Sequence, residues 1–172
     1  MAIIGQRVEA GILEAATKFF NGPVGHGVED EAEKLGPKHF VVKLSREPDM
    51  PKTEFRRKAL ALQKLGDEGK LVKTKVVRDR AVTKRYRQDV IDRIYRQFNS
   101  RNPEFSRRLI NRVTKRMQPD HVHELQLGGG DVADNLQFLD AYTNWHIGTQ
   151  QIRKQIRHLP DGTPIKIEVI KW

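Results

Sequence analysis

Apolar residues in this chain follow strand spacing in some segments and helix spacing in others. HFVVKL (39–44) is a short strand candidate, and PIKIEVIKW (164–172) alternates apolar and charged positions, which predicts another strand. Residues 53–65 predict a helix that begins after Pro51 and stops at Gly66. KLVKTKVV (70–77) also alternates and predicts a further strand.

Two amphipathic helices are predicted next. In YRQDVIDRIYRQF (86–98) apolar residues recur at helical spacing, with Arg, Asp and Gln opposite them. Asn102 is a suitable N-cap for the following helix, and Pro103 suits its first turn. The apolar stripe of that second helix consists of Phe105, Leu109, Ile110 and Val113.

The segment after Pro119 predicts a hairpin followed by a helix. One strand is expected to run to about Leu127, GGGD (128–131) to turn, and NLQFLD (135–140) to return as the second strand. The glycines permit a tight, left-handed turn. A helix is then expected from about residue 141 or 143 to 158, with Ile147, Ile152 and Ile156 facing inward.

Charge is distributed unevenly along the 172 residues, which carry a net charge of +10. Residues 1–36 hold three basic and six acidic side chains, whereas residues 77–116 hold thirteen basic and four acidic ones. A basic surface can simply be solubilising, but arginine dominates here, and guanidinium suits bidentate phosphate contact. We therefore expect residues 1–36 to form an adaptor or linker and residues 37–172 to form the functional domain.

Several classes of protein are excluded by composition. The chain has no cysteine, so disulfides, thiolate zinc sites and a cysteine nucleophile are ruled out. Any metal must be held by Asp, Glu, His, Asn or water. The start of the chain has no basic segment before a long apolar run, so no signal peptide is expected, and no membrane span is expected.

The candidate chemistry lies in PDHVHELQLGGGDVADNLQFLDAYTN (119–144). His121 is a natural general base near neutral pH, and Asp120 beside it is a natural ligand for a hard metal. Asn144 could meet Asp120 across the hairpin. Asn135 could bond the loop or the backbone near His121 and hold its geometry. Together these residues would suit metal-assisted phosphodiester cleavage.

This segment resembles the HNH (His-Me finger) endonucleases. The matching positions are Asp120-His121, Gly128-Gly129, Asn135-Leu136-Gln137, Leu139 and Asn144, within residues 117–157. The resemblance implies an α+β fold: a mainly helical basic region, then a ββα-metal finger at about 117–158, then a C-terminal strand. Two departures matter. Asn144 stands where many members have histidine, as in the H-N-N variant, and the CxxC pairs of some members are absent.

The resemblance also implies roles for individual residues. His121 would be the general base, Asp120 and Asn144 the metal ligands, and Asn135 a catalytic-site residue that supports the hairpin or orients His121. One divalent cation is implied, with Mg²⁺ expected first and Zn²⁺, Mn²⁺ or Ni²⁺ as alternatives. The role of His123 stays open between a third ligand, a phosphate donor and a satisfied polar residue. Glu124 is either a solvated carboxylate or a partner of His123.

The expected function is hydrolysis of DNA with low sequence specificity. The residues expected to grip phosphates are Arg107, Arg108, Arg112, Lys115 and Arg116. The segment also looks like the nuclease toxin modules of bacterial polymorphic toxins. That resemblance implies an effector secreted without a signal peptide, acting in the cytoplasm of a target bacterium and neutralised by a cognate immunity protein; otherwise the protein would be cytoplasmic. The alternatives are an RNase, a phage or restriction HNH enzyme, and a non-catalytic nucleic-acid-binding module.

Overall fold

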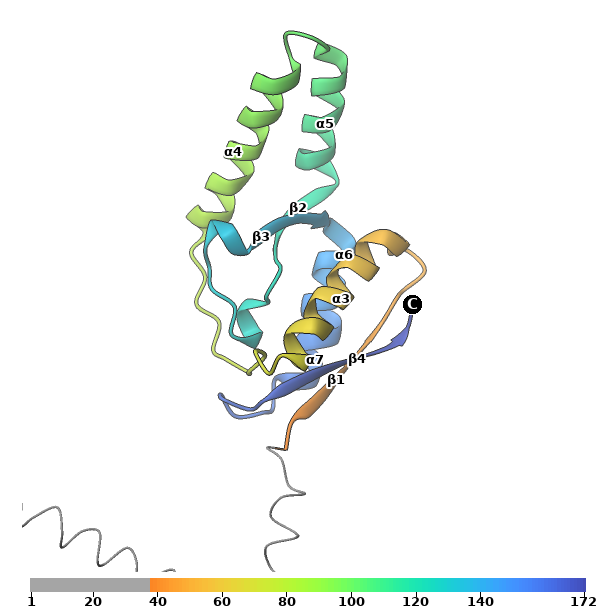
Figure 1. Cartoon of the computed structure of the whole chain (residues 1–172), viewed down its shortest axis with the longest axis vertical. Helices are drawn as coiled ribbons and strands as arrows, with labels where there is room; N and C mark the ends of the chain where they lie inside the picture. Colours follow the sequence, from red (N-terminus) through yellow and green to blue (C-terminus); the bar gives the residue numbers. More distant parts are fainter. Residues whose placement is uncertain (1–37) are drawn as a thin grey trace, which may run out of the picture. The chain divides into compact units, whose positions relative to one another are not determined.

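The computed structural model describes residues 38–172 (Figure 1). Residues His39–Trp172 form one compact unit. The linker predicted for residues 1–36 lies outside the described residues. All of the predicted site residues lie inside them.

A two-stranded parallel sheet joins the beginning and the end of this unit. Strand β1 (Phe40–Ser45) pairs with β4 (Ile165–Lys171), with Phe40 opposite Ile165. The alternation in the sequence has the expected cause, because Val42, Leu44, Ile165 and Ile167 are buried on one face. Both terminal strand predictions are confirmed.

The outer edge of β1 is bonded by glutamine side chains rather than by a third strand. The Gln155 amide accepts from the Lys43 backbone N–H at 3.0 Å and donates to the Lys43 carbonyl oxygen at 2.8 Å. Gln151 bonds the N–H and carbonyl of Ser45 in the same way, at 2.9 and 2.7 Å. Each amide replaces the two hydrogen bonds of a neighbouring strand residue, which satisfies part of the open edge.

Helix α3 (Lys52–Asp67) packs beside β4, and its buried face consists of Phe55, Lys58, Ala59, Leu62 and Gly66. Their spacing places them on one side of the helix. The apolar members of this face join a core with the two strands and with Ile147, Ile152 and Ile156. The helix is confirmed, and it extends slightly beyond the predicted residues 53–65.

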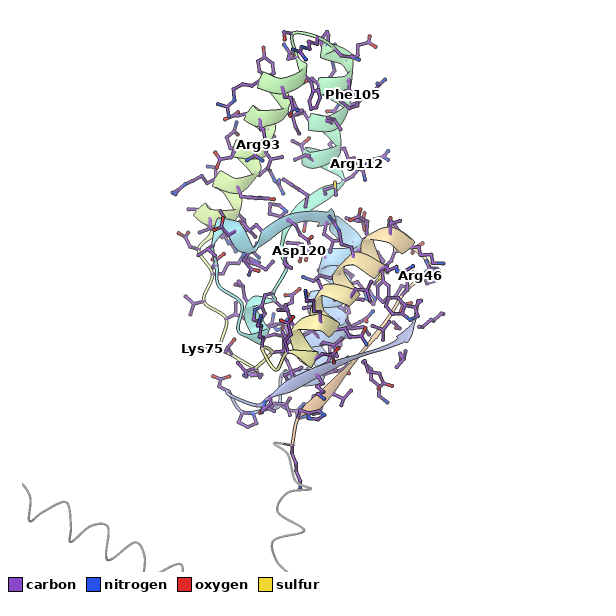
Figure 2. All side chains as sticks on the ribbon, in the orientation of Figure 1. Arg46, Lys75, Arg93, Phe105, Arg112 and Asp120 are labelled. Atoms are coloured by element: carbon purple, nitrogen blue, oxygen red, sulfur yellow. The ribbon has the colours of Figure 1, made fainter. Side chains whose placement is uncertain are left out.

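Helices α4 (Arg80–Phe98) and α5 (Pro103–Lys115) form a hairpin that stands away from this core (Figures 1 and 2). The Asp79 and Asn102 side chains cap the two helices by accepting from Ala81 N and Phe105 N, as predicted for Asn102. Phe98 and Phe105 meet edge to face at 5.2 Å near the turn. No residue of α4 is buried, and most arginine side chains of the two helices are exposed to solvent.

The predicted order of hairpin and helix is present. Strands β2 (Met117–His121) and β3 (Leu136–Asp140) are antiparallel, with Asp120 opposite Gln137. A continuous helical segment follows: α6 (Ala141–Trp145), the π-helical stretch η3 (His146–Arg153) and α7 (Lys154–Ile156). The Asp140 side chain caps its start by accepting from Thr143 N at 2.9 Å.

Two strand predictions are wrong. The strand expected from Pro119 to Leu127 ends at His121 and is followed by a 3₁₀ turn, η1 (Leu125–Leu127). Pairing with β3 ends here because the Asn135 N–H bonds the Val132 carbonyl within a second 3₁₀ turn, η2 (Ala133–Asn135), and the Asn135 side chain bonds the N–H and carbonyl of His123. Residues 70–77 make only an isolated bridge between Val72 and Pro164, since the N–H groups of Val72 and Thr74 bond carbonyls of η1 instead of a strand.

The described residues thus have an α+β fold, as expected in general terms. No helix within residues 38–172 is long and apolar enough to cross a membrane.

Candidate functional site

Asp120, His121 and Asn144 line one cavity of about 270 Å³. Asp120 and His121 come from the end of β2, and Asn144 comes from α6. Asp120 and His121 are 2% and 7% exposed, so only a small part of each side chain reaches solvent. Arg78 and Arg153 line the same cavity and bring positive charge to it.

The His121 imidazole is held by a carboxylate that sequence analysis did not select. Its Nε2 lies 2.8 Å from Asp131 Oδ1, just after the three glycines. The other oxygen of Asp131 accepts from the backbone N–H of Asp79 at 2.6 Å, immediately before α4. Asp131 therefore connects the imidazole to the start of the basic helix hairpin. With Nε2 protonated toward Asp131, Nδ1 carries the lone pair that can take a proton.

Lys58 is the second residue that sequence analysis missed. Its side chain is completely buried beneath the site, and its ammonium binds both Asp120 oxygens, at 2.8 and 3.0 Å. The same ammonium lies 2.8 Å from Glu124 Oε1 and donates to the His121 carbonyl oxygen. One cation from α3 thus holds Asp120, Glu124 and the backbone of the predicted base.

Two carboxylates around one ammonium explain how these groups titrate. Burial alone would lower the pKa of Lys58, but the negative charges of Glu124 and Asp120 outweigh it and raise that pKa above its ordinary value. Burial raises the pKa of the Asp120 carboxyl, although the Lys58 ammonium acts in the opposite direction. The ammonium therefore stays charged at neutral pH.

The Asn135 side chain holds the loop between β2 and β3 through hydrogen bonds to the loop backbone. Its Oδ1 accepts from His123 N at 2.9 Å, and its Nδ2 donates to the carbonyls of His123 and Gly130, both at 2.8 Å. The glycine turn packs against the same backbone. A Cβ on Gly129 would lie only 1.9 Å from the His123 carbonyl oxygen, and Gly128 has the left-handed φ of 96° that the sequence predicts. Asn135 contacts the loop and not the imidazole itself.

The two residues with open roles have local partners. His123 Nε2 lies 2.8 Å from the Leu127 carbonyl oxygen, so its ring is tied to the 3₁₀ turn behind the site. This is the arrangement of a satisfied polar residue. Glu124 lies in the cavity and pairs with Lys58 instead of His123.

The donors in the cavity match a hard divalent cation in type. Asp120 Oδ2 already accepts from Lys58 and Gln137, whereas Oδ1 accepts only from Lys58. Since a carboxylate oxygen has two lone pairs, Oδ1 can still supply one ligand. Asn144 can supply its amide oxygen. Within residues 38–172 no three His, Asp or Glu side chains are grouped to hold a metal, so this set would depend on Asn144 and water.

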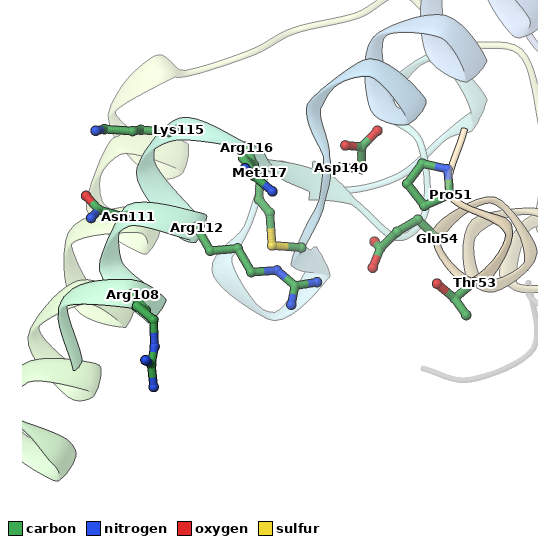
Figure 3. Close-up of a pocket in the computed structure, with 10 residues that line it drawn as sticks. All are labelled: Pro51, Thr53, Glu54, Arg108, Asn111, Arg112, Lys115, Arg116, Met117 and Asp140. Carbon is green, nitrogen blue, oxygen red and sulfur yellow. The ribbon is translucent and has the colours of Figure 1, made fainter. Parts of the chain in front are cut away.

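The predicted phosphate-binding residues lie on a different cavity. Arg108, Arg112, Lys115 and Arg116 line a cavity of about 610 Å³, with the start of α3 on its opposite side (Figure 3). That cavity also includes Glu54 and Asp140 and shares no residue with the one that contains His121. Arg107 is exposed on α5 and lines neither.

Basic residues of α4 and the segment before it adjoin the site instead. A further cavity of about 390 Å³ is lined by Arg78, Lys84 and Arg87. It shares Arg78 and Asn144 with the His121 cavity, so the two are neighbours. Besides Lys58 beneath the site, Arg78 and Arg153 therefore line the cavity of the predicted base, and Lys84 and Arg87 of α4 line its neighbour.

No family model matches this chain, and no curated protein or solved structure gives a significant match to it.

The sequence contains a weak signal for each of the two residues that were not predicted, Lys58 and Asp131. Lys58 lies on the apolar face of α3, between Phe55 and Leu62, where a charged residue needs a buried partner. Asp131 follows the glycine triplet directly. Neither position indicates which residue its side chain pairs with; Lys58 and Asp120, for example, are 62 positions apart.

Acid titration should report the bond between Asp131 and His121. Burial would raise the pKa of Asp131, but hydrogen bonds from His121 and the Asp79 N–H lower it below its ordinary value. A lowered folded-state pKa stabilises the fold above the ordinary carboxyl pKa, and this contribution is lost as the pH falls through the folded value. Asp131→Asn should therefore lose less stability on acidification than the wild type, measured by urea unfolding at several pH values. An unchanged acid dependence would show that Asp131 has no such partners in solution.

Proposed function

We propose that this protein is an HNH-type endonuclease that hydrolyses phosphodiester bonds of DNA with the aid of a divalent cation. The observation that carries the proposal is the shared cavity of Asp120, His121 and Asn144 beside Arg78 and Arg153. The antiparallel β2–β3 pair followed by α6 has the strand and helix order of a ββα-metal finger. A general base, oxygen ligands and cationic side chains in one cavity suit attack on a phosphodiester.

His121 acts in this proposal as the general base. With Nε2–H donating to Asp131, Nδ1 takes the proton from the attacking water, and the carboxylate stabilises the imidazolium that results. Asn135 holds the loop, and Lys58 holds the backbone carbonyl of His121. Arg78 and Arg153 bind the phosphates on either side of the bond that is cut.

Asp120 Oδ1 and the Asn144 amide oxygen would hold the cation, with Mg²⁺ first in order and Mn²⁺, Zn²⁺ or Ni²⁺ as alternatives. Such an ion neutralises negative charge on the phosphate and the leaving oxygen. Lys58 and Gln137 together leave Asp120 one ligand position, and the Lys58 ammonium adds fixed positive charge behind that carboxylate.

The test of this proposal is cleavage of supercoiled plasmid in the presence of single divalent cations, with EDTA as the control. Cleavage that requires a cation supports the endonuclease. Retained DNA binding without cleavage under any of the cations would favour the alternative, a non-catalytic binding module. Total RNA incubated beside the plasmid separates a DNase from an RNase.

We further propose that the nuclease serves as an antibacterial toxin, on the strength of its resemblance to polymorphic-toxin modules. An acidic immunity protein would then neutralise it in the producing cell, since the chain carries a net charge of +10. The site of action would be the cytoplasm of a target bacterium.

Two pairs of arginines should differ in their contribution to activity. Arg78→Ala/Arg87→Ala and Arg108→Ala/Arg112→Ala each remove two positive charges, but only the first pair lies beside the His121 cavity. Losing a phosphate contact weakens binding across sequences and reduces the salt slope by about 1 per residue. We expect the first pair to reduce both the salt slope of DNA affinity and the cleavage rate more than the second. Equal losses would show that overall charge, and not position, governs binding.

A further inference from the structure

An exposed cluster of aromatic rings lies beside the proposed site. Tyr142 and Trp145 are 37% and 49% exposed, and their ring centroids lie 6.1 Å apart. His146 completes the cluster, at 5.6 Å from Tyr142 and 5.9 Å from Trp145. The buried residues of this stretch are Thr143 and Ile147, so the core does not use the aromatic side of the helix.

Trp145 belongs to the wall of the cavity that contains His121. Gly148, Thr149 and Arg153 of the same helical segment line that wall with it. Arg78, from the segment before α4, also lines the cavity. The acidic residues in the cavity, Asp120 and Glu124, are both paired with Lys58. Trp145 therefore stands among guanidinium groups that have phosphate as a natural ligand.

We infer that Trp145, supported by Tyr142 and His146, stacks on an unpaired nucleobase, so that the substrate is single-stranded or locally unpaired nucleic acid. This inference rests on the proposed function. Aromatic rings interleaved with basic side chains bind single strands, because every base has a face that can stack and a backbone that arginine can hold. A duplex keeps its base faces stacked inside, so it offers Trp145 only a backbone or a groove edge.

The charge around the rings favours nucleic acid over a second copy of this chain as the occupant. Arg78, Lys84, Arg87 and Arg153 line this cavity and the one next to it. A second copy of the chain would bring the same positive charge to the same place, which disfavours self-association there.

The chain contains two tryptophans, which allows a matched fluorescence experiment. Trp172→Phe leaves Trp145 as the reporter, whereas Trp145→Phe leaves Trp172. Trp172 packs against Phe55 at 6.2 Å and lines a separate pocket with Lys52 and Leu60. Both variants are titrated in EDTA with an oligothymidylate and with a duplex of equal phosphate count.

Quenching of Trp145 by the single strand, weak quenching by the duplex and no change at Trp172 are the expected results. Trp145→Ala should lower single-strand affinity about 5- to 150-fold, the range that corresponds to one stacked base, and Trp172→Ala should not. Equal quenching by duplex and single strand would overturn the inference, as would no quenching at all. So would a concentration-dependent shift in Trp145 emission without nucleic acid, accompanied by dimers in sedimentation.

The two proposals fail separately. Plasmid cleavage without quenching of Trp145 removes the stacking surface and leaves the nuclease in place. Quenching by single strands without cleavage under any cation keeps the stacking surface and removes the nuclease.

Discussion

Replacing His121 with asparagine should abolish plasmid cleavage while the protein stays folded. An amide can still donate to Asp131, but it cannot accept the proton of the attacking water. General-base catalysis contributes about 10²- to 10⁴-fold to rate, so the loss should fall in that range or below detection. The measurement is the initial rate of supercoiled plasmid nicking with the best divalent cation.

Matched variants separate loss of the base from loss of the fold. His121→Ala should be as inactive as His121→Asn, whereas His158→Ala removes an exposed histidine outside the cavity and should cleave normally. Urea unfolding of each variant shows whether the site is intact. Wild-type rates in both His121 variants would exclude His121 as the base, whatever the protein binds.

The same variants test the toxin role in cells. Expression of the wild type should arrest bacterial growth, and expression of His121→Asn should not. If an enzyme that is active on plasmid proves harmless when expressed, the toxin role is excluded and the nuclease activity remains.

Lys58→Met should destabilise the fold by about 3–5 kcal/mol, because it leaves Asp120 buried without its cation. Methionine is similar in length and in helix propensity, so the loss reports the charge and not the packing of α3. The free energy of unfolding in urea gives the measurement. Lys64→Met on the same helix is the control: its side chain is 78% exposed and 3.9 Å from Glu68, and it should change stability by about 0.5 kcal/mol or less.

The pH dependence of this defect has a definite sign. Burial already raises the pKa of Asp120, and loss of the Lys58 ammonium removes an effect that lowers it. A raised folded-state pKa means that the folded protein holds its proton more tightly than the unfolded chain, so stability falls as the pH rises above the ordinary value of about 4. The deficit of Lys58→Met should therefore be small in acid and largest near neutral pH.

A second change should repair much of the first. In Lys58→Met/Asp120→Asn no buried carboxylate remains at position 120, so the double variant should be more stable than Lys58→Met at neutral pH. If Lys58→Met is as stable as Lys64→Met, the ion pair does not form in solution. The site would then lack the support that holds the His121 backbone.

Local patterns in the sequence accounted for much of the secondary structure. The alternation of β1 and β4, the apolar face of α3 and the cap at Asn102 each depend on residues within a few positions of one another. The strand expected over 70–77 failed because alternation alone does not supply a partner strand. The hairpin strand stopped early because the chain opposite it turns into a 3₁₀ turn, where the Asn135 N–H bonds Val132 instead of the strand.

The candidate site, too, was only partly predictable from local sequence. The sequence by itself determined the segment that holds Asp120, His121, Asn135 and Asn144, since their spacing along one hairpin and helix is a local property. It did not determine which cations surround them. Folding decided that Arg78 and Arg153 line the cavity while most of the predicted arginines of α5 line another. Folding also brought Lys58 to Asp120 and Asp131 to His121, because a buried charge takes the partner that packing places beside it, however distant in sequence.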